Sequence, residues 1–329
     1  MLLMLLLLLL LLLITSTITS NDHVTVAISM TSIPSRFNHM TECLLSWINQ
    51  DVQPNYIFIF IPKQYKRFKR KQEYHDDDGN VVVTFTRKLI SILNNSIELQ
   101  EYIINNMINV IEIDKDWGPI TKVIGMLQYN NDWLKYDYRK QPDYWIIGDD
   151  DVKYLKNTIS DYIIAINTLP IGNNNNIKNN ILTHFPEDNR IKVNINNENI
   201  TINHVQGVDT ILFPTILLLN QCLYGYSFCY NNLIILLKYF HKKCTDSFYQ
   251  DDYIISYSLA LGSIKVNSIW NNDNVAKNID GISKSNMQMH LNSKVFKRES
   301  NTKECIILSS NEIQNILNNN NNNNNKYDL

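Results

Sequence analysis

Three consecutive aspartates provide the densest group of chemically active side chains in the chain. Asp149, Asp150 and Asp151 follow an apolar run, residues 144–147, whose length and composition predict a buried strand. Neighbouring carboxylates repel one another unless a cation lies among them, and Mg²⁺ and Mn²⁺ prefer oxygen ligands. Carboxylates just beyond a strand also lie where open α/β sheets bind ligands. The stretch therefore predicts a divalent metal site, and the alternative is an ordinary acidic turn.

A second acidic triplet, at residues 76–78, differs in its surroundings. It follows a polar and basic stretch at residues 63–71 and precedes Gly79 and Asn80. Glycine and asparagine are turn residues, and no apolar run leads into these acids. This triplet therefore predicts a surface turn rather than a metal site.

The elements that must position the first triplet begin with a strand–helix–strand unit. Residues 23–29 alternate in a β-branched pattern that predicts a strand, residues 37–50 have the apolar spacing of an amphipathic helix, and residues 56–61 predict a second strand. This order is typical of βαβ units, so we expect a parallel α/β sheet. Further along we expect strands at residues 81–85, 110–113, 191–194, 199–205 and 264–269, and helices at residues 89–105, 119–129, 151–169 and 233–241 and before residues 219 and 261.

The order of the motifs resembles that of the GT-A glycosyltransferases, nucleotide-sugar-dependent enzymes with a DXD motif. The acidic triplet after a strand is similar to that motif, and the loop at residues 31–36 looks like the donor-nucleotide loop of the fold. Residues 116–122, Asp-Trp-Gly-Pro-Ile-Thr-Lys, are similar to an Asp-aromatic-Gly-Pro-x-x-Lys motif of some members. Asp251 and Asp252, at the head of a helical pattern, look like the acids that contact the acceptor in many members. Together these motifs span residues 24–262.

The resemblance implies an α/β fold of GT-A-like, Rossmann-like type, with a mixed, mainly parallel central sheet flanked by helices. It implies Mn²⁺ or Mg²⁺ as cofactor, held by Asp149 and Asp151 with His290 as a further candidate. Such a metal neutralises the leaving diphosphate as a Lewis acid. Arg36 and Lys122 would also balance phosphate charge, and each is otherwise a surface cation. The implied donor-binding residues are Ser32, Arg36, Asp116, Lys122, Asp149 and Asp150.

The resemblance also implies a hexosyltransferase-like enzyme that takes a UDP- or GDP-sugar as donor and a glycan, protein or lipid as acceptor. Asp251 or Asp252 would accept the proton of the attacking hydroxyl in an inverting enzyme. An acid in the first helical turn also stabilises the helix dipole, which is the structural alternative for this pair. Two other functions would use the same acids: a metal-dependent phosphohydrolase, and a non-catalytic secreted carbohydrate-binding relative.

The N-terminal residues predict entry into the secretory pathway. Residues 2–14 are almost all leucine and precede a short polar stretch, which is typical of a signal peptide because a membrane span needs about 20 apolar residues. We assign residues 1–20 to a cleaved signal peptide, with an uncleaved type II membrane anchor as the alternative. Sequons at Asn94 and Asn199 agree with a location in the Golgi or ER lumen, or outside the cell.

The composition of the chain indicates one large domain and argues against nucleic acid as a partner. The chain has 329 residues, of which 44% are hydrophobic, enough for one large domain that we place at residues 22–300. Residues 301–329 include an asparagine run and predict a disordered tail. A net charge of −2 gives no basic field for nucleic acid. The five cysteines fit no zinc site, their odd number leaves at least one without an intramolecular partner, and a bridge among Cys222, Cys229 and Cys244 is open.

Overall fold

We describe the chain from a computed structural model, which defines residues 24–65, 84–136, 141–168, 181–183, 190–195, 198–203, 210–220, 230–244, 251–261, 266–268, 276–278, 305 and 312. The predicted signal peptide, the second acidic triplet, His290 and the asparagine run lie outside the described residues. Within the described ranges, no helix is both long enough and apolar enough to cross a membrane.

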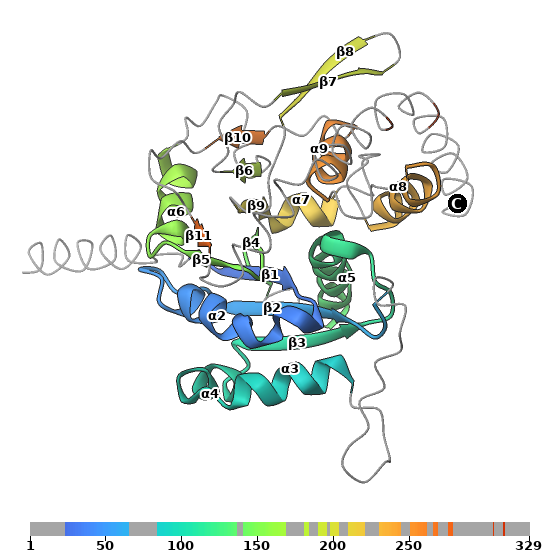
Figure 1. Ribbon diagram of the computed structural model, residues 1–329. Helices are drawn as coiled ribbons and strands as arrows, with labels where there is room; N and C mark the ends of the chain where they lie inside the picture. The colour runs from blue at the N-terminus through green and yellow to red at the C-terminus, as the bar shows by residue number, and fades with distance from the viewer. Residues whose placement is uncertain are drawn as a thin grey trace, which may run out of the picture.

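A mixed sheet of seven strands organises the described residues (Figure 1). Its members are β1 Val26–Thr31, β2 Tyr56–Pro62, β3 Ile108–Ile113, β4 Tyr144–Ile147, β6 Ile181–Thr183, β9 Ile211–Pro214 and β10 Val266–Ser268. Their order across the sheet is β10-β6-β9-β4-β1-β2-β3. β9 runs antiparallel to β4 and β6, and the other neighbours in the sheet are parallel. The predicted α/β class with a mixed, mainly parallel sheet is therefore confirmed.

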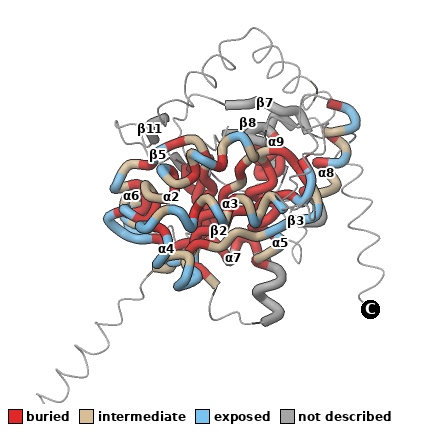
Figure 2. The backbone as a smooth tube through the Cα atoms, turned by 60° about the horizontal axis from the view of Figure 1, so that its bottom comes forward, coloured by how far each residue is buried: buried red, intermediate tan, exposed pale blue. Residues whose placement is uncertain are grey.

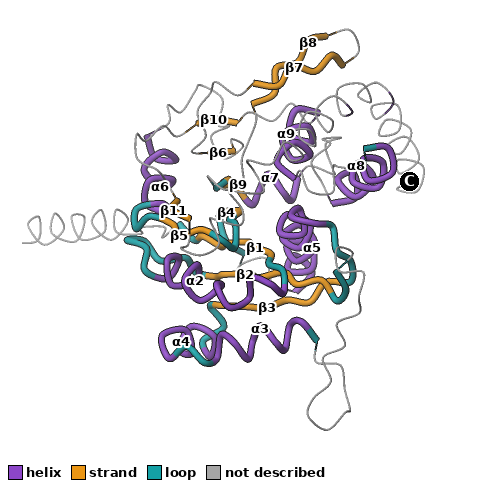
Figure 3. The backbone as a smooth tube through the Cα atoms, in the orientation of Figure 1, coloured by secondary structure: helices purple, strands orange, loops and turns teal. Residues whose placement is uncertain are grey.

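Helices cover both faces of this sheet (Figure 3). They are α2 Met40–Ile48, α3 Phe85–Asn94, α4 Ile97–Ile104, α5 Thr121–Tyr136, α6 Thr158–Thr168, α7 Thr215–Asn220, α8 Tyr230–Lys243 and α9 Asp251–Leu261. Residues of α5, α7, α8 and α9 share one hydrophobic core, and residues of α2, α3, α4 and α6 share the other. Figure 2 shows the buried residues concentrated in the middle of the molecule.

Strand residues alternate between these two cores, as the pleat of a strand requires. In β2, Phe58 and Phe60 join the core under α5, whereas Ile57, Ile59 and Ile61 join the core under α2. All five side chains are buried. Burial from both sides explains why the β2 sequence is a continuous apolar run rather than an alternating one.

The predicted strand–helix–strand opening is confirmed, with a shorter helix. β1 leads through a 3-10 turn, η1 (Pro34–His39), into α2 and then β2. Proline suits the first turn of a helical segment because it lacks the N–H that would be unsatisfied there. The α-helix predicted over residues 37–50 therefore begins only at Met40, and its Leu44 and Trp47 face the core.

The predicted strand at residues 81–85 is wrong at its described end. Phe85 is the first residue of α3, and the Thr84 side chain caps that helix by accepting a hydrogen bond from the Arg87 backbone N–H at 3.2 Å. The single helix predicted over residues 89–105 is instead two helices, α3 and α4, with a break at Asn95 and Ser96. The cap at Thr84 and the break at Asn95 and Ser96 therefore set the helix boundaries, which the spacing of apolar residues alone did not predict.

The predicted helix over residues 151–169 is also wrong at its start. Residues Val152–Tyr154 form β5, which pairs antiparallel with β11 (Ala276–Asn278), and α6 begins only at Thr158. The sequence pattern predicts β4 and, within residues 264–269, β10, but not the equally short strands β5, β6 and β9. The hairpin of β7 (Arg190–Ile195) and β8 (Glu198–Asn203) confirms the strands expected at residues 191–194 and 199–205.

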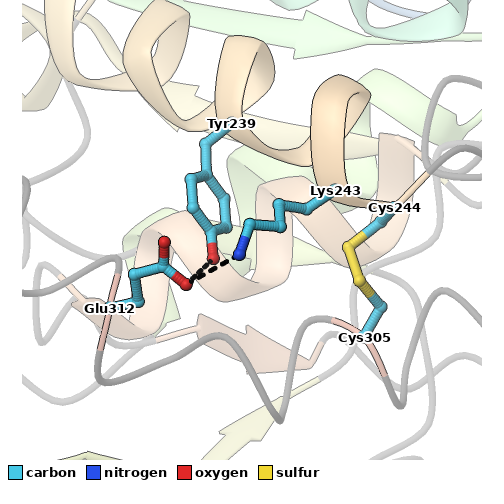
Figure 4. The surroundings of a disulfide bond; sticks show 5 residues. All are labelled: Tyr239, Lys243, Cys244, Cys305 and Glu312. Carbon is cyan, nitrogen blue, oxygen red and sulfur yellow. Dashed lines mark hydrogen bonds and ion pairs between the residues drawn. A yellow bond between two sulfur atoms is a disulfide. The ribbon is translucent and has the colours of Figure 1, made fainter.

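The disulfide pairing differs from the one left open by the sequence. Cys244, just after α8, is bonded to Cys305, and not to Cys222 or Cys229, which lie outside the described residues (Figure 4). Cys43 is a free, buried thiol. The bond depends on which distant segments meet, and the spacing of cysteines along a chain does not contain that information. It also holds one position of the predicted tail, residues 301–329, against α8.

Candidate functional site

The centre of the sheet brings two loops together at one edge. β1 and β4 are parallel neighbours, and their register pairs Ser29 with Ile147. The backbone N–H of Gly148 then donates to the carbonyl of Ser29 at 3.0 Å. The segment after β1, which carries Ser32 and Arg36, therefore reaches the acidic triplet after β4. Ligands of open α/β sheets bind at this carboxyl edge.

Asp150 is the most enclosed of the three acids, with a side chain 6% exposed. Ser32 Oγ donates to one carboxylate oxygen at 2.5 Å, and Arg36 Nη1 donates to the other at 2.8 Å. The Ser32 carbonyl in turn accepts a hydrogen bond from the Tyr65 hydroxyl at 2.7 Å. Asp150 thus ties the β1 loop to the β4 turn, and the structure brings three of the predicted donor-binding residues together.

Asp149 forms an ion pair with Lys122 from the first turn of α5. The Lys122 side chain is only 3% exposed, and that of Asp149 is 22% exposed. The backbone of Lys122 is held as well, because its carbonyl accepts a hydrogen bond from Ser29 Oγ at 2.7 Å. A third segment, far from both loops in sequence, is therefore fixed at the same edge of the sheet.

Asp151 has a carboxylate 3.2 Å from Arg36 Nη1 and is 15% exposed. Burial, together with the negative charges of Asp150 and Asp149, raises the pKa of Asp151 to about 6. Arg36 and Lys122 oppose that rise without cancelling it. Among the described residues, three carboxylates lie beside these two cations, and Asp151 is the acid whose pKa rises.

Arg36 responds to the same charges in the opposite sense. Its burial would lower its pKa, but the carboxylates of Asp150 and Asp151 outweigh that effect, and the pKa of Arg36 is raised. The guanidinium therefore stays charged, and it contacts two acids at once. A planar guanidinium suits such a double contact better than an ammonium does.

The Asp116–Lys122 segment forms a tight turn before α5. The backbone N–H of Gly118 donates to Asp116 Oδ1 at 2.8 Å, and the Trp117 N–H donates to Thr121 Oγ1 at 3.1 Å. Gly118 has a φ of 77°, a conformation that glycine adopts without strain. Asp116 is buried, and this hydrogen bond shapes the turn that delivers Lys122 to Asp149.

Two side chains that the sequence did not single out hold the backbone of the triplet. The Asp149 N–H donates to the Tyr154 hydroxyl at 2.6 Å, and the Asp149 carbonyl accepts from Cys43 Sγ at 3.4 Å. Tyr154 stands five residues after Asp149, on the strand β5 that was expected to be helical. The alternation of apolar Val152, charged Lys153 and aromatic Tyr154 was the available sequence signal, although three residues are too few to establish a period.

The remaining predicted site residues lie at the limit of the described structure. Asp251 and Asp252 are the first two residues of α9, whose Ile254 and Ile255 join the core under α5. Their side chains are outside the described part of the structure, as is the whole of His290. The structure therefore shows where α9 begins, and the side-chain contacts of Asp251 and Asp252 lie outside the described residues.

The carboxylates of Asp149 and Asp151 are suitable ligands for a divalent metal ion. In the described ranges, no group of three or more His, Cys, Asp and Glu side chains is arranged to hold one. Mg²⁺ in nucleotide-dependent enzymes is instead commonly bound by one or two carboxylates, with substrate phosphates and water completing its shell. Asp151, whose pKa is raised by burial and by the neighbouring acids, and the partly exposed Asp149 fit that smaller role.

Comparisons with known proteins give distant similarities of fold. No family model and no curated protein matches the chain. Among solved structures, S. aureus TarS matches with 12% identity and a TM-score of 0.37 over 81% of this chain and 38% of that one, and its residues 1–349 match over 65% and 55%. The inositol-1-phosphate CTP transferase from T. maritima matches with 11% identity and a TM-score of 0.34 over 85% and 96%.

A third similar structure is the bifunctional glycosyltransferase WbbM, with 12% identity and a TM-score of 0.35 over 74% of this chain and 38% of that one. The chain thus spans about half of the structure of TarS residues 1–349 and less of the full TarS and WbbM chains. With TM-scores below 0.5, these similarities carry no argument about activity. The function proposed below is argued from the residues of the site.

Proposed function

We propose that the chain is a metal-dependent glycosyltransferase of the GT-A type that uses a nucleotide-sugar donor. The observation that carries the proposal is the meeting of three separate motifs at the edge of β1 and β4. The loop at residues 31–36, the turn at residues 116–122 and the acidic triplet converge through the contacts of Arg36 and Lys122 with the three acids. These are the motifs on which the family resemblance rests.

In this proposal the donor diphosphate lies across the ends of β1 and β4. Asp151, with Asp149, would hold the metal, and Asp149 would also contact the nucleotide ribose. Asp150 keeps the β1 loop in place through Ser32 and Arg36. Arg36 and Lys122 keep cationic charge beside the phosphates, and Asp116 contributes by shaping the turn before Lys122. His290 is a candidate for one more contact with the metal or the phosphates.

The proposed reaction is the transfer of a glycosyl group to a hydroxyl. The hydroxyl oxygen forms a bond with the anomeric carbon, and the bond from that carbon to the phosphate oxygen breaks, its electron pair staying on the diphosphate. In an inverting enzyme, Asp251 or Asp252 accepts the hydroxyl proton. A bound Mn²⁺ or Mg²⁺ would supply positive charge to the leaving diphosphate. The acceptor is a glycan or another glycoconjugate.

We place this activity in the secretory pathway, in the lumen of the ER or Golgi or outside the cell. The leucine-rich N-terminus supports entry into that pathway, either as a signal peptide or as a type II anchor. The Cys244–Cys305 disulfide supports it independently, because disulfides persist in oxidising compartments and are rare in the cytosol.

The test is a thermal-unfolding screen of the purified chain with UDP- and GDP-sugars, with Mn²⁺ and with EDTA. We expect one nucleotide family to stabilise the chain by about 2.7 kcal/mol at a hundredfold excess over Kd, and only when metal is present. Mn²⁺ alone should shift the transition little, because one or two carboxylates bind it weakly without phosphates. Radiolabelled sugar should then appear on a glycan acceptor rather than in water.

Two variants separate the site from nonspecific effects of charge. Asp151→Asn should abolish the metal-dependent shift, whereas Asp114→Asn removes an 85% exposed acid after β3 and should leave the shift intact. An equal shift in EDTA would refute metal dependence. Release of phosphate from simple esters, with no sugar transfer, would favour a phosphohydrolase, and a shift without turnover would favour a carbohydrate-binding relative.

A further inference from the structure

The Tyr154 hydroxyl contacts both backbone polar groups of Asp149. Its hydroxyl accepts a hydrogen bond from the Asp149 N–H at 2.6 Å and lies 3.3 Å from the Asp149 carbonyl, to which it donates. Cys43 Sγ donates to the same carbonyl at 3.4 Å. The backbone groups at the base of the acidic triplet are therefore satisfied by side chains of β5 and α2 rather than by solvent.

Tyr154 is itself held rigidly. It is buried, its ring stacks on Trp47 with centroids 4.0 Å apart, and its backbone N–H donates to Ser46 Oγ at 3.0 Å. Gly148 allows the hydroxyl to approach, because a Cβ on that residue would lie 3.1 Å from both the Tyr154 hydroxyl and the Trp47 ring. A ring fixed in this way restrains the backbone of Asp149, to which its hydroxyl is hydrogen-bonded.

We propose that Tyr154 is a positioning residue of the donor site, an inference that rests on the proposed function. By fixing the Asp149 peptide, its hydroxyl sets the directions in which the carboxylates of Asp149 and Asp151 leave the backbone. Lys122 is held by α5 and Arg36 by the loop after β1. A rotation of the Asp149 backbone would therefore weaken the Lys122–Asp149 and Arg36–Asp151 ion pairs together. Tyr154 does not touch the donor in this scheme.

The variant Tyr154→Phe removes the hydroxyl and keeps the stack on Trp47. Tyr162→Phe is a matched control, because the buried Tyr162 hydroxyl makes a 2.7 Å hydrogen bond with Thr210 Oγ1. Groups that orient metal ligands typically contribute about 10–100-fold to affinity. We therefore expect Tyr154→Phe to raise the Kd of the Mn²⁺–nucleotide complex at least about tenfold, whereas Tyr162→Phe changes it less than about twofold at a similar loss of stability.

A second measurement keeps the inference testable if the chain binds no nucleotide. The coupling between Lys122 and Asp149, measured by a double-mutant cycle on unfolding, should fall by about half in the Tyr154→Phe background and persist in the Tyr162→Phe background. Failure of nucleotide binding in the unaltered chain would count against the proposed function alone. Equal coupling in both backgrounds, or equal Kd values, would show that Tyr154 is merely structural. Cys43→Ala, which loses the thiol donor, should act in the same direction as Tyr154→Phe.

A separate observation concerns the C-terminal residues, two of which are fastened to α8. Cys305 is bonded to Cys244, and Glu312 accepts a hydrogen bond from the Tyr239 hydroxyl at 2.6 Å and pairs with Lys243 at 3.2 Å (Figure 4). Lys243 also lies over the Tyr239 ring, 5.8 Å from its centroid. The covalent bond and the ionic contact are made by the last turn of α8 and the residue that follows it.

α8 also belongs to the core that supports the site, and Cys244 and Cys305 pack with that same core. Leu233, Leu237 and Phe240 are fully buried there, and α8 packs against α5, the helix that begins with Lys122. His241 lies against Trp117, in the turn before α5, with ring centroids 6.1 Å apart. α8 thus contacts both this core and, at its C-terminal end, Cys305 and Glu312.

We infer that the Cys244–Cys305 bond makes the stability of α8 dependent on the redox state. Two electrons and two protons from a thiol reductant would convert the bond into two thiols. Of the described C-terminal contacts with α8, the packing of Cys305 and the contacts of Glu312 would then remain. The contact of Glu312 is exposed to solvent, and exposed ion pairs contribute little. Reduction should therefore loosen α8 before it affects the strands β1, β2 and β4.

Hydrogen exchange followed by mass spectrometry tests this inference on the complete chain. Amides of residues 230–244 should exchange at least about tenfold faster in Cys305→Ser than in the oxidised parent, and those of β1 and β4 should change little. Cys43→Ser, which alters a free buried thiol, is the control and should leave α8 unchanged. Glu312→Gln should give a smaller acceleration. Unchanged exchange of α8 in Cys305→Ser, or in the parent after reduction, would overturn the inference.

Discussion

Replacing Lys122 by methionine tests whether the acidic triplet depends on a buried cation. The Lys122 side chain is 3% exposed and pairs with Asp149, which is 22% exposed. Methionine keeps most of the apolar stem and removes the ammonium group. Asp149 would then lie beside Asp150 and Asp151 without the Lys122 ammonium, and Arg36 would be the remaining cation of this described group.

The burial of this pair sets the expected cost. Removing one partner of a buried ion pair typically costs about 3–5 kcal/mol, because the other charge is left in a poorly solvated place. Asp149 retains some contact with water, so we expect Lys122→Met to lower the free energy of unfolding by about 2–3 kcal/mol at neutral pH. The additional change Asp149→Asn should restore more than half of that loss, since the excess charge is then gone.

The chain contains a matched control. Lys63 pairs with Asp114 at the same edge of the sheet, but their side chains are 53% and 85% exposed. Exposed pairs contribute little to stability, so Lys63→Met should cost clearly less than Lys122→Met. Urea denaturation followed by circular dichroism measures both variants, provided that the m-value is unchanged. Equal costs for the two variants, or no coupling between Lys122 and Asp149, would refute the reasoning.

Three further predictions concern stability. Because the folded-state pKa of Asp151 is raised to about 6 from a normal 3.8, the folded chain binds this proton more tightly than the unfolded chain. The free energy of unfolding should therefore fall, by at most roughly 3 kcal/mol, as pH rises from about 4 to about 6. In urea unfolding without metal, Asp151→Asn should lack this decrease with pH. Gly125→Ala should cost about 1–3 kcal/mol in the same assay, because its methyl group would overlap the buried Phe60 ring, and a neutral result would show that α5 shifts freely. Thr84→Ala should cost about 1 kcal/mol through loss of the α3 cap, while Thr84→Ser, which keeps an acceptor, should cost less; equal costs would argue against capping.

The strands that the sequence predicts well are those whose burial is visible locally. β1, β2 and β4 are apolar runs bounded by proline, glycine or charged residues, and two of them enclose an amphipathic helix. That order is enough to predict a parallel α/β sheet, because parallel strands need a helical crossover. β5, β6 and β9 are short, and they are strands only because β11, β10 and β4 lie beside them. Pairing with a distant partner is decided by the tertiary fold and is not encoded in the few residues of the strand itself.

The sequence by itself determined the chemistry that is present: three adjacent carboxylates after a buried strand, and two cations, Arg36 and Lys122, in motifs elsewhere in the chain. It also determined the fold class, since hydrophobic patterning and element order are local properties. Only the tertiary structure decided that Arg36 contacts Asp150 and Asp151 while Lys122 contacts Asp149, and that Tyr154 holds the peptide of Asp149. These contacts join residues whose distance depends on strand register and helix packing, which no pattern along the chain encodes.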